Sequence, residues 1–111
     1  MSAPTPNLPL MDAVEAQIDA HPETWDQTVY RNDCGTAYCY AGWAVTLTLG
    51  EGEWLRGDFL FHQVAHARAA SLLGLTRCEA NALFCANNSR EDIALVSKHI
   101  RERAAEQGAA S

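Results

Sequence analysis

The chain has 111 residues, of which 48% are hydrophobic and 20% charged, which suits one globular domain with a single modest core. Its formal net charge is −6, and only one arginine accompanies the acidic residues of its first third, so this part of the chain would repel nucleic acid. No basic leader or bilayer-length apolar run is present, so we expect a cytoplasmic protein with four reduced cysteines and no membrane association.

The first predicted element is a helix from about Leu8 to Ala20. Residues 1–6 are small and proline-containing and should form a loose lead, whereas Asn7 is a good N-cap and Pro9 suits a first helical turn. His21-Pro22 should end the helix because proline disfavours helical geometry in the residue before it. The apolar positions repeat every three or four residues and predict the core-facing side: Met11, Val14 and Ile18.

The opposite side of this helix carries Asp12, Glu15 and Asp19, also three and four residues apart. We expect this face to be solvated and negative, and to attract a basic partner protein through a field that salt screens. Reversing the three charges to lysine should then leave folding nearly intact.

The next segment, from Glu23 to Asp33, has no clean period. It holds three large apolar side chains, Trp25, Val29 and Tyr30, and we expect an irregular connection fixed by aromatic burial.

A charge-free stretch between Thr36 and Leu49 predicts a buried central helix over about 36–49. Such a helix is about 21 Å long, too short to cross a membrane. Asn32, Asp33 or Thr36 could cap it, and Gly50 could end it. At its end, apolar residues alternate with threonine from Val45 to Leu49, a pattern typical of a strand, so a strand over 45–49 is an open alternative.

The segment 51–57 is typical of a loop anchored by Trp54. Asp58 could cap the following helix, predicted from Phe59 to Leu73, and Gly74 could end it. The carboxylates of this region, Glu51, Glu53 and Asp58, could hold a metal or act as acid and base, but such a run is more typical of a solvated loop.

Thr76 and Glu79 have the spacing of a capping box, in which each side chain binds the other residue's amide, and a short helix should follow to about Cys85. A last helix should begin at Asn88 or Ser89 and fray over 107–111. Its inward positions are predicted to be Ile93, Val96 and Ile100. Together these elements predict a mainly α fold: residues 1–111 as one compact domain of four to five helices around the buried 36–49 helix.

The residues CGTAYCYAGWA (34–44), followed by AASLLGLTRCEANALF (69–84) and ANN (86–88), resemble a group of small proteins of actinobacterial phages and their hosts. That group shares a CGTxxCxAGWA-like core and a later LLGL…LF segment. The resemblance covers roughly Trp25 to Ile93. It implies a phage or actinobacterial origin and interference with a host factor, and it implies no catalytic residues.

Two cysteines and two histidines, Cys34, Cys39, His62 and His66, have an order that superficially suits tetrahedral zinc. The pairs are loosely spaced, and Cys39 falls inside the apolar stretch, so we favour core packing and expect no metal and no cofactor. Cys78 and Cys85 are seven residues apart and share a helix face, so they could join a second metal site or face Cys34 and Cys39 across the core, and we favour neither.

Residues 64–84 could form two helices joined by a turn at Gly74, and this arrangement would imitate a helix-turn-helix. The second helix of a DNA reader presents several basic or amide side chains, and here it offers Arg77 and Asn81. Since phosphate contacts supply most non-specific affinity, nucleic acid is an unlikely partner for this acidic chain.

We therefore expect a small, non-enzymatic factor that binds another protein, with a helix-turn-helix or zinc-containing regulator as the alternative. No cysteine or serine stands in a recognisable nucleophile motif, which makes an enzyme the third choice. The candidate anchors are the aromatic residues outside periodic faces, although these could equally cover the ends of the core: Trp25, Tyr30 and Trp54.

Overall fold

The computed structural model describes residues 4–31, 36–50 and 62–110, without the side chains of 62–64 and 108–110. In these residues the chain is mainly α, as the sequence predicted, and contains no strand, only an isolated bridge between Trp25 and Tyr38. The helices are α1 (Leu8–Ala20), the 3-10 turn η1 (Pro22–Thr24), α2 (Tyr40–Leu49), α4 (His62–Leu73), α5 (Arg77–Leu83) and α6 (Arg90–Ala110).

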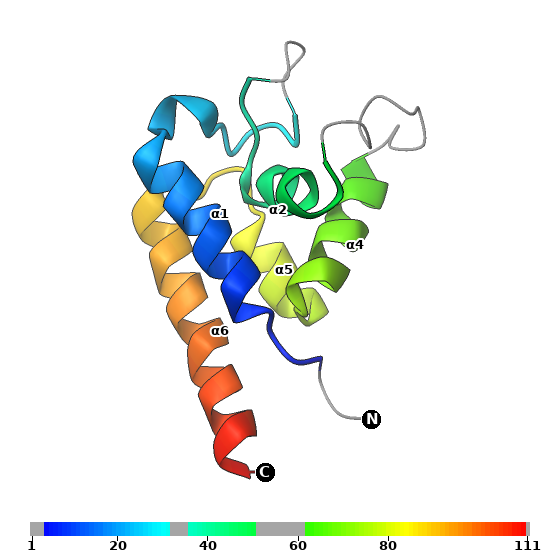
Figure 1. The fold of residues 1–111 in the computed structure, drawn as a ribbon, viewed down its shortest axis with the longest axis vertical. Coiled ribbons are helices and arrows are strands. Elements are labelled where there is room, and N and C mark those ends of the chain that lie inside the picture. Colours follow the sequence, from blue (N-terminus) through cyan, green and yellow to red (C-terminus); the bar gives the residue numbers. More distant parts are fainter. Residues whose placement is uncertain (1–3, 32–35, 51–61, 111) are drawn as a thin grey trace.

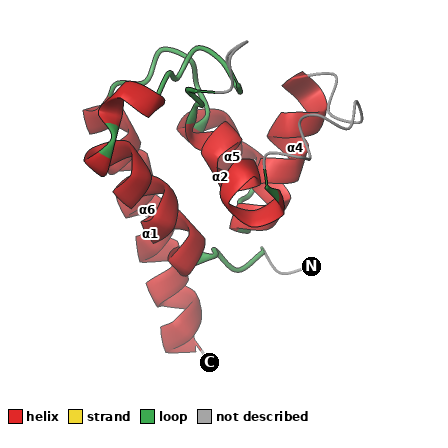
Figure 2. Cartoon of the chain, turned by 45° about the horizontal axis from the view of Figure 1, so that its top comes forward, coloured by secondary structure: helices red, strands yellow, loops and turns green. Residues whose placement is uncertain are grey.

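The α2 helix lies between α1 and α4 and packs against both (Figure 1). The short α5 contacts both α4 and α6. The long α6 runs beside α1, and its last turns extend beyond the rest of the bundle in both views (Figures 1 and 2).

Every helix contributes to one hydrophobic core. The sequence predicted the inward positions of α1 and most of those of α6 correctly, except that Val96 is only half-buried. The largest fully buried side chains are Met11, Val14, Ile18, Tyr40, Val45, Leu73, Leu83, Ile93 and Ile100.

Several helix ends match their sequence signals. The Asn7 side chain accepts a hydrogen bond from the Leu10 amide, and Thr76 and Glu79 form the expected capping box. Gly50 and Gly74 follow α2 and α4 with φ of 88° and 67°, in the left-handed region that favours glycine.

The start of α2 differs from the prediction. The helix begins at Tyr40, not near residue 36, and its cap is Cys39, whose Sγ accepts from the Gly42 amide at 3.4 Å. Thr36 does not cap it, and Asn32 and Asp33 lie outside the described residues. The amides of Tyr38 and Cys39 bind the carbonyls of Thr24 and Val29 at 2.9 Å, so this stretch is paired with the irregular segment and cannot be helical.

The alternative of a strand over 45–49 is wrong, because α2 continues to Leu49. The α5 helix ends at Leu83, two residues earlier than predicted, because Gln27 and Asn88 bind its last carbonyls. Asp58 and the predicted start of the preceding helix at Phe59 lie outside the described residues, and α4 is described from His62.

The N-terminal lead is not loose over residues 4–6, contrary to the prediction. Pro6 is buried, the Asn7 amide donates to the Leu73 carbonyl at 2.8 Å, and Arg103 Nη1 donates to the Pro4 carbonyl at 2.6 Å. Arg103 also forms an ion pair with Glu79 at 2.6 Å, which joins the lead, α5 and α6. Burial alone would raise the pKa of Glu79, but the hydrogen bonds from Arg103 and Thr76 lower it. At the other end, α6 remains helical through Ala110, beyond the expected fraying point.

Candidate functional site

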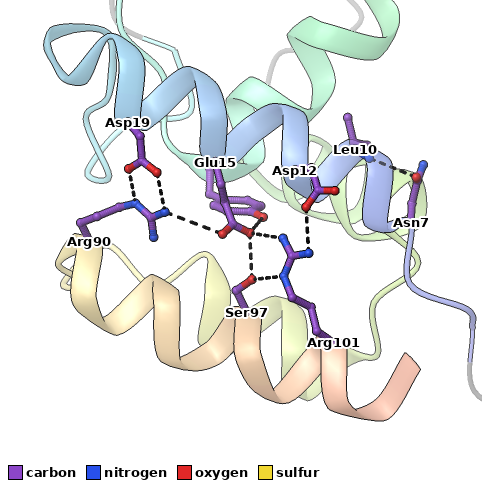
Figure 3. A network of polar contacts seen from close by, with 9 residues as sticks. Asn7, Leu10, Asp12, Glu15, Asp19, Arg90, Ser97 and Arg101 are labelled. Carbon is purple, nitrogen blue, oxygen red and sulfur yellow. Dashed lines mark hydrogen bonds and ion pairs between the residues drawn. The ribbon is translucent and has the colours of Figure 1, made fainter. Parts of the chain in front are cut away.

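The acidic side of α1 lies along α6, and its carboxylates reach arginines of that helix (Figure 3). Asp19 accepts two hydrogen bonds from Arg90, at 2.8 and 3.0 Å, and Asp12 accepts one from Arg101 at 2.8 Å. Both carboxylates are more than half exposed, yet each is paired with a cation. The α1 charges therefore hold α6 in place.

Glu15 is the centre of this arrangement, with a side chain only 16% exposed. Its Oε2 accepts from the Tyr40 hydroxyl at 2.8 Å, from Ser97 Oγ at 2.8 Å and from Arg101 Nη2 at 3.0 Å. Burial and the adjacent Glu15 carboxylate raise the pKa of Tyr40, so its phenol stays a hydrogen-bond donor. We call this network the clasp: Asp12, Glu15, Asp19, Tyr40, Arg90, Ser97 and Arg101.

The predicted face is solvated at Asp12 and Asp19, which are more than half exposed, but it is not the free negative surface that was expected. The helical period showed correctly that these side chains share a side of α1, but Arg90 and Arg101 form ion pairs with them and offset two of the three negative charges. The hydrogen bond from Arg90 also lowers the pKa of Asp19, which keeps that carboxylate charged. Asp12, Glu15 and Asp19 are therefore residues of the fold, and we no longer assign them to a partner.

Replacing Glu15 with leucine should lower the free energy of unfolding by about 2–4 kcal/mol, because Arg101 and the Tyr40 hydroxyl lose their buried acceptor. Asp12→Asn is the matched control, since it weakens an exposed pair worth at most about 1 kcal/mol. Urea unfolding followed by circular dichroism measures both. The same argument reverses the expectation for the triple lysine variant, which should unfold far more readily than the native chain. Equal urea midpoints for the Glu15 and Asp12 variants would contradict the central role of Glu15.

A groove of 380 Å³ lies beside the clasp, between α1 and α6. Its size is within the range of small-molecule sites. However, three of the five polar or charged residues that line it, Glu15, Ser97 and Arg101, already satisfy one another in the clasp, and the other two are Lys98 and Glu102. A ligand would have to break those bonds, so we do not assign the groove a ligand.

The predicted aromatic anchors cover the core. Trp25 and Tyr30 are half-buried and pack against it, and the Trp25 indole donates to Gln27 Oε1 at 2.9 Å. Tyr30 crosses the first turn of α2 so closely that its carbonyl meets Gly42. Trp54 lies outside the described residues. Trp25 and Tyr30 therefore cover the core, which was the alternative to partner binding that the sequence left open.

The sequence analysis missed an exposed apolar surface at the end of α2. Leu47 and Leu49 are 43% and 40% exposed, and Trp43, one turn before Leu47, is half-buried. The exposed Thr48 donates its hydroxyl to the Ala44 carbonyl at 2.7 Å, which leaves its methyl group as the free part of the side chain. We call this surface the α2 tip: Trp43, Thr46, Leu47, Thr48 and Leu49.

The α2 tip carries no charge, because residues 36–50 contain none. That absence was interpreted as burial of the whole helix. The core covers the first turns of α2, where Tyr40, Ala41, Ala44 and Val45 are fully buried, and the last turn projects from it.

The proposed zinc ligands have other roles where the structure describes them. Cys39 is buried and caps α2, and burial raises the pKa of its thiol to about 11. The His66 ring contacts Phe84 edge-on, with centroids 5.1 Å apart. Cys34 and the side chain of His62 lie outside the described residues. Cys39, Cys78 and Cys85 are free thiols, and within the described residues no three potential ligands are grouped around a metal position.

The α4–α5 corner has the outline of a helix-turn-helix, with Gly74, Leu75 and Thr76 between the two helices. The exposed side chains of α5 include Arg77 and Asn81, while its acidic Glu79 is tied to Arg103. This surface offers few groups that could contact phosphates.

Comparisons of the chain with protein-family models, with curated proteins and with solved structures found no significant match. Over the part that the structure describes, none of the helices has both the length and the apolar character needed to cross a membrane.

Proposed function

We propose that this chain is a small, non-enzymatic domain that binds another protein through the α2 tip. The observation that carries the proposal is the pair of exposed leucines, Leu47 and Leu49, at the end of a helix without a single charge. Surface helices normally carry charged residues on their outward side, and apolar anchors beside an aromatic side chain are typical of the centres of protein interfaces.

The surroundings of the α2 tip indicate the chemistry of the partner. The Trp43 indole donates to the Thr24 carbonyl at 2.9 Å, so the tip adjoins the segment that carries Glu23 and Asp26. Glu51 and Glu53 follow the tip directly in the sequence, and the whole chain has a net charge of −6. A partner with an apolar patch and a rim of lysine or arginine would complement this surface.

Two potential nucleophiles have structural roles instead, which supports a non-enzymatic function. The Cys39 thiol is buried with a raised pKa and caps α2. Ser97 is buried, donates to Glu15 and accepts from Arg101. Ser97 does lie beside a carboxylate, but its side chain is buried and Glu15 is already bound by Tyr40 and Arg101, so neither Cys39 nor Ser97 is a free nucleophile.

The origin of the protein and the identity of its partner rest on the resemblance described for residues 34–44, 69–84 and 86–88. On that basis we place the protein in the cytoplasm of an actinobacterial host, either as a phage product or as a host protein, with a host protein as its target. The helix-turn-helix or zinc-containing regulator remains the alternative, supported by the outline of the α4–α5 corner.

The test compares Leu47→Asp and Leu49→Asp with Ala82→Asp, a control at an exposed position on α5. The control should change stability by roughly 0.5 kcal/mol. The tip variants should cost about 1–2 kcal/mol, because the leucines are partly covered and an acidic residue in the last turn opposes the helix dipole, so all three are first checked for folding by circular dichroism. A protein captured from host lysate by the native chain is purified, and its affinity for each variant is measured by titration. We expect the two tip variants to bind at least about tenfold more weakly, or about 1.4 kcal/mol, and the control to bind as the native chain does.

Undiminished binding by both tip variants would reject the α2 tip as the interface. Retardation of duplex DNA by the native chain at physiological salt would instead favour the regulator built on α4 and α5.

A further inference from the structure

The outward face of α6 carries the most exposed large hydrophobic side chain of the described residues, Leu95, at 61% exposure. It lies opposite the clasp, since Arg90, Ser97 and Arg101 point from α6 toward α1 (Figure 3). Around Leu95, one helical turn in each direction, stand four exposed charged or titratable residues: Glu91, Asp92, Lys98 and His99.

The charges of these four residues change sign at Leu95. The two before Leu95 are acidic and the two after it are basic or able to become so. When two identical helices pack antiparallel about a two-fold axis through one residue, each position before that residue faces the equally distant position after it. An axis at Leu95 therefore places Glu91 opposite His99 of the second copy, and Asp92 opposite Lys98 of the second copy.

We propose that this face of α6 is a self-association surface, on which two copies of the chain pack antiparallel with their Leu95 side chains in contact. The two-fold axis produces the Asp92–Lys98 ion pair twice and the Glu91–His99 pair twice, so four polar pairs surround one apolar contact. The Glu91–His99 pair carries opposite charges only when His99 is protonated, and His99 also lies 3.5 Å from Glu102 of its own helix. A parallel arrangement would instead place Glu91 against Glu91 and Lys98 against Lys98, which is repulsive.

The expected dimer is weak. One helix face against another is a small interface, and exposed ion pairs contribute little individually. Association should therefore depend on protein concentration and decrease as salt is raised, because the paired charges are exposed to solvent. The α2 tip takes no part, so self-association and the proposed partner binding can be tested separately.

The experiment uses two single variants with complementary charges, Glu91→Lys and His99→Glu. Asp92 is left unchanged because it caps α6, with its carboxylate accepting from the Ser89 amide at 2.9 Å. Sedimentation velocity is measured for the native chain, for each variant and for their equimolar mixture, from micromolar to millimolar protein. We expect the native chain to dimerise and each variant alone to associate at least tenfold more weakly.

The mixture should recover dimers, because the introduced lysine then faces the introduced glutamate. Leu95→Gln should also abolish association without changing the thermal midpoint, while Ala82→Asp on α5 should dimerise as the native chain does. A native chain that stays monomeric at millimolar concentration would overturn the proposal. So would variants that dimerise normally, or a mixture that fails to recover dimers.

Discussion

Replacing Gly42 with alanine is expected to lower the free energy of unfolding by about 3 kcal/mol or more. A Cβ atom at this position would lie 1.8 Å from the Tyr30 carbonyl oxygen and 2.9 Å from its carbon. These are backbone atoms, which cannot rotate away as a flexible side chain could. Thermal and urea unfolding measure the effect, and Gly42→Leu should unfold the protein outright.

The sign of the change is informative, because alanine in place of glycine inside an ordinary helix stabilises by roughly 0.5–1 kcal/mol. Ala13→Gly on the exposed side of α1 is the control, since it measures the propensity difference alone. A midpoint for Gly42→Ala equal to or above that of the native protein would show that Tyr30 does not cross α2 at this point.

Replacing Gln27 with leucine is expected to lower the free energy of unfolding by about 3–5 kcal/mol, although the side chains are similar in size. Gln27 is buried, and its amide joins three segments. Its Oε1 accepts from the Trp25 indole and the Tyr40 amide, and its Nε2 donates to the carbonyls of Leu83 and Cys85. Leucine would leave the Trp25 indole and the Tyr40 amide without an acceptor in the interior, whereas the carbonyls of Leu83 and Cys85 keep their hydrogen bonds from Asn88.

The control for this prediction is Gln17→Leu. Gln17 is half-buried and its side-chain amide donates to Thr24 Oγ1 at 3.3 Å, so its loss should cost about 1 kcal/mol or less. Both variants are compared by urea unfolding with the native chain. If they unfold at the same urea concentration, Gln27 is not the residue that joins α2 to the end of α5.

The sequence by itself determined the elements whose causes are local. The bounds of α1, its cap at Asn7, the capping box of Thr76 and Glu79, and the glycines that end α2 and α4 were all predicted correctly. Each depends on residues within about one helical turn, so neighbouring side chains and backbone preferences are sufficient to specify it. The inward faces of α1 and α6 followed from periodicity for the same reason.

The tertiary structure alone decided where these elements meet. Asp12 and Arg101 are 89 residues apart, and Asp19 and Arg90 are 71 apart, so no local pattern could show that the acidic face is paired with arginines of α6. The start of α2 depends on backbone pairing with the irregular segment, and the exposure of Leu47 and Leu49 depends on where the core ends. A helical period shows which residues share a face, but what covers that face is decided by packing between distant segments.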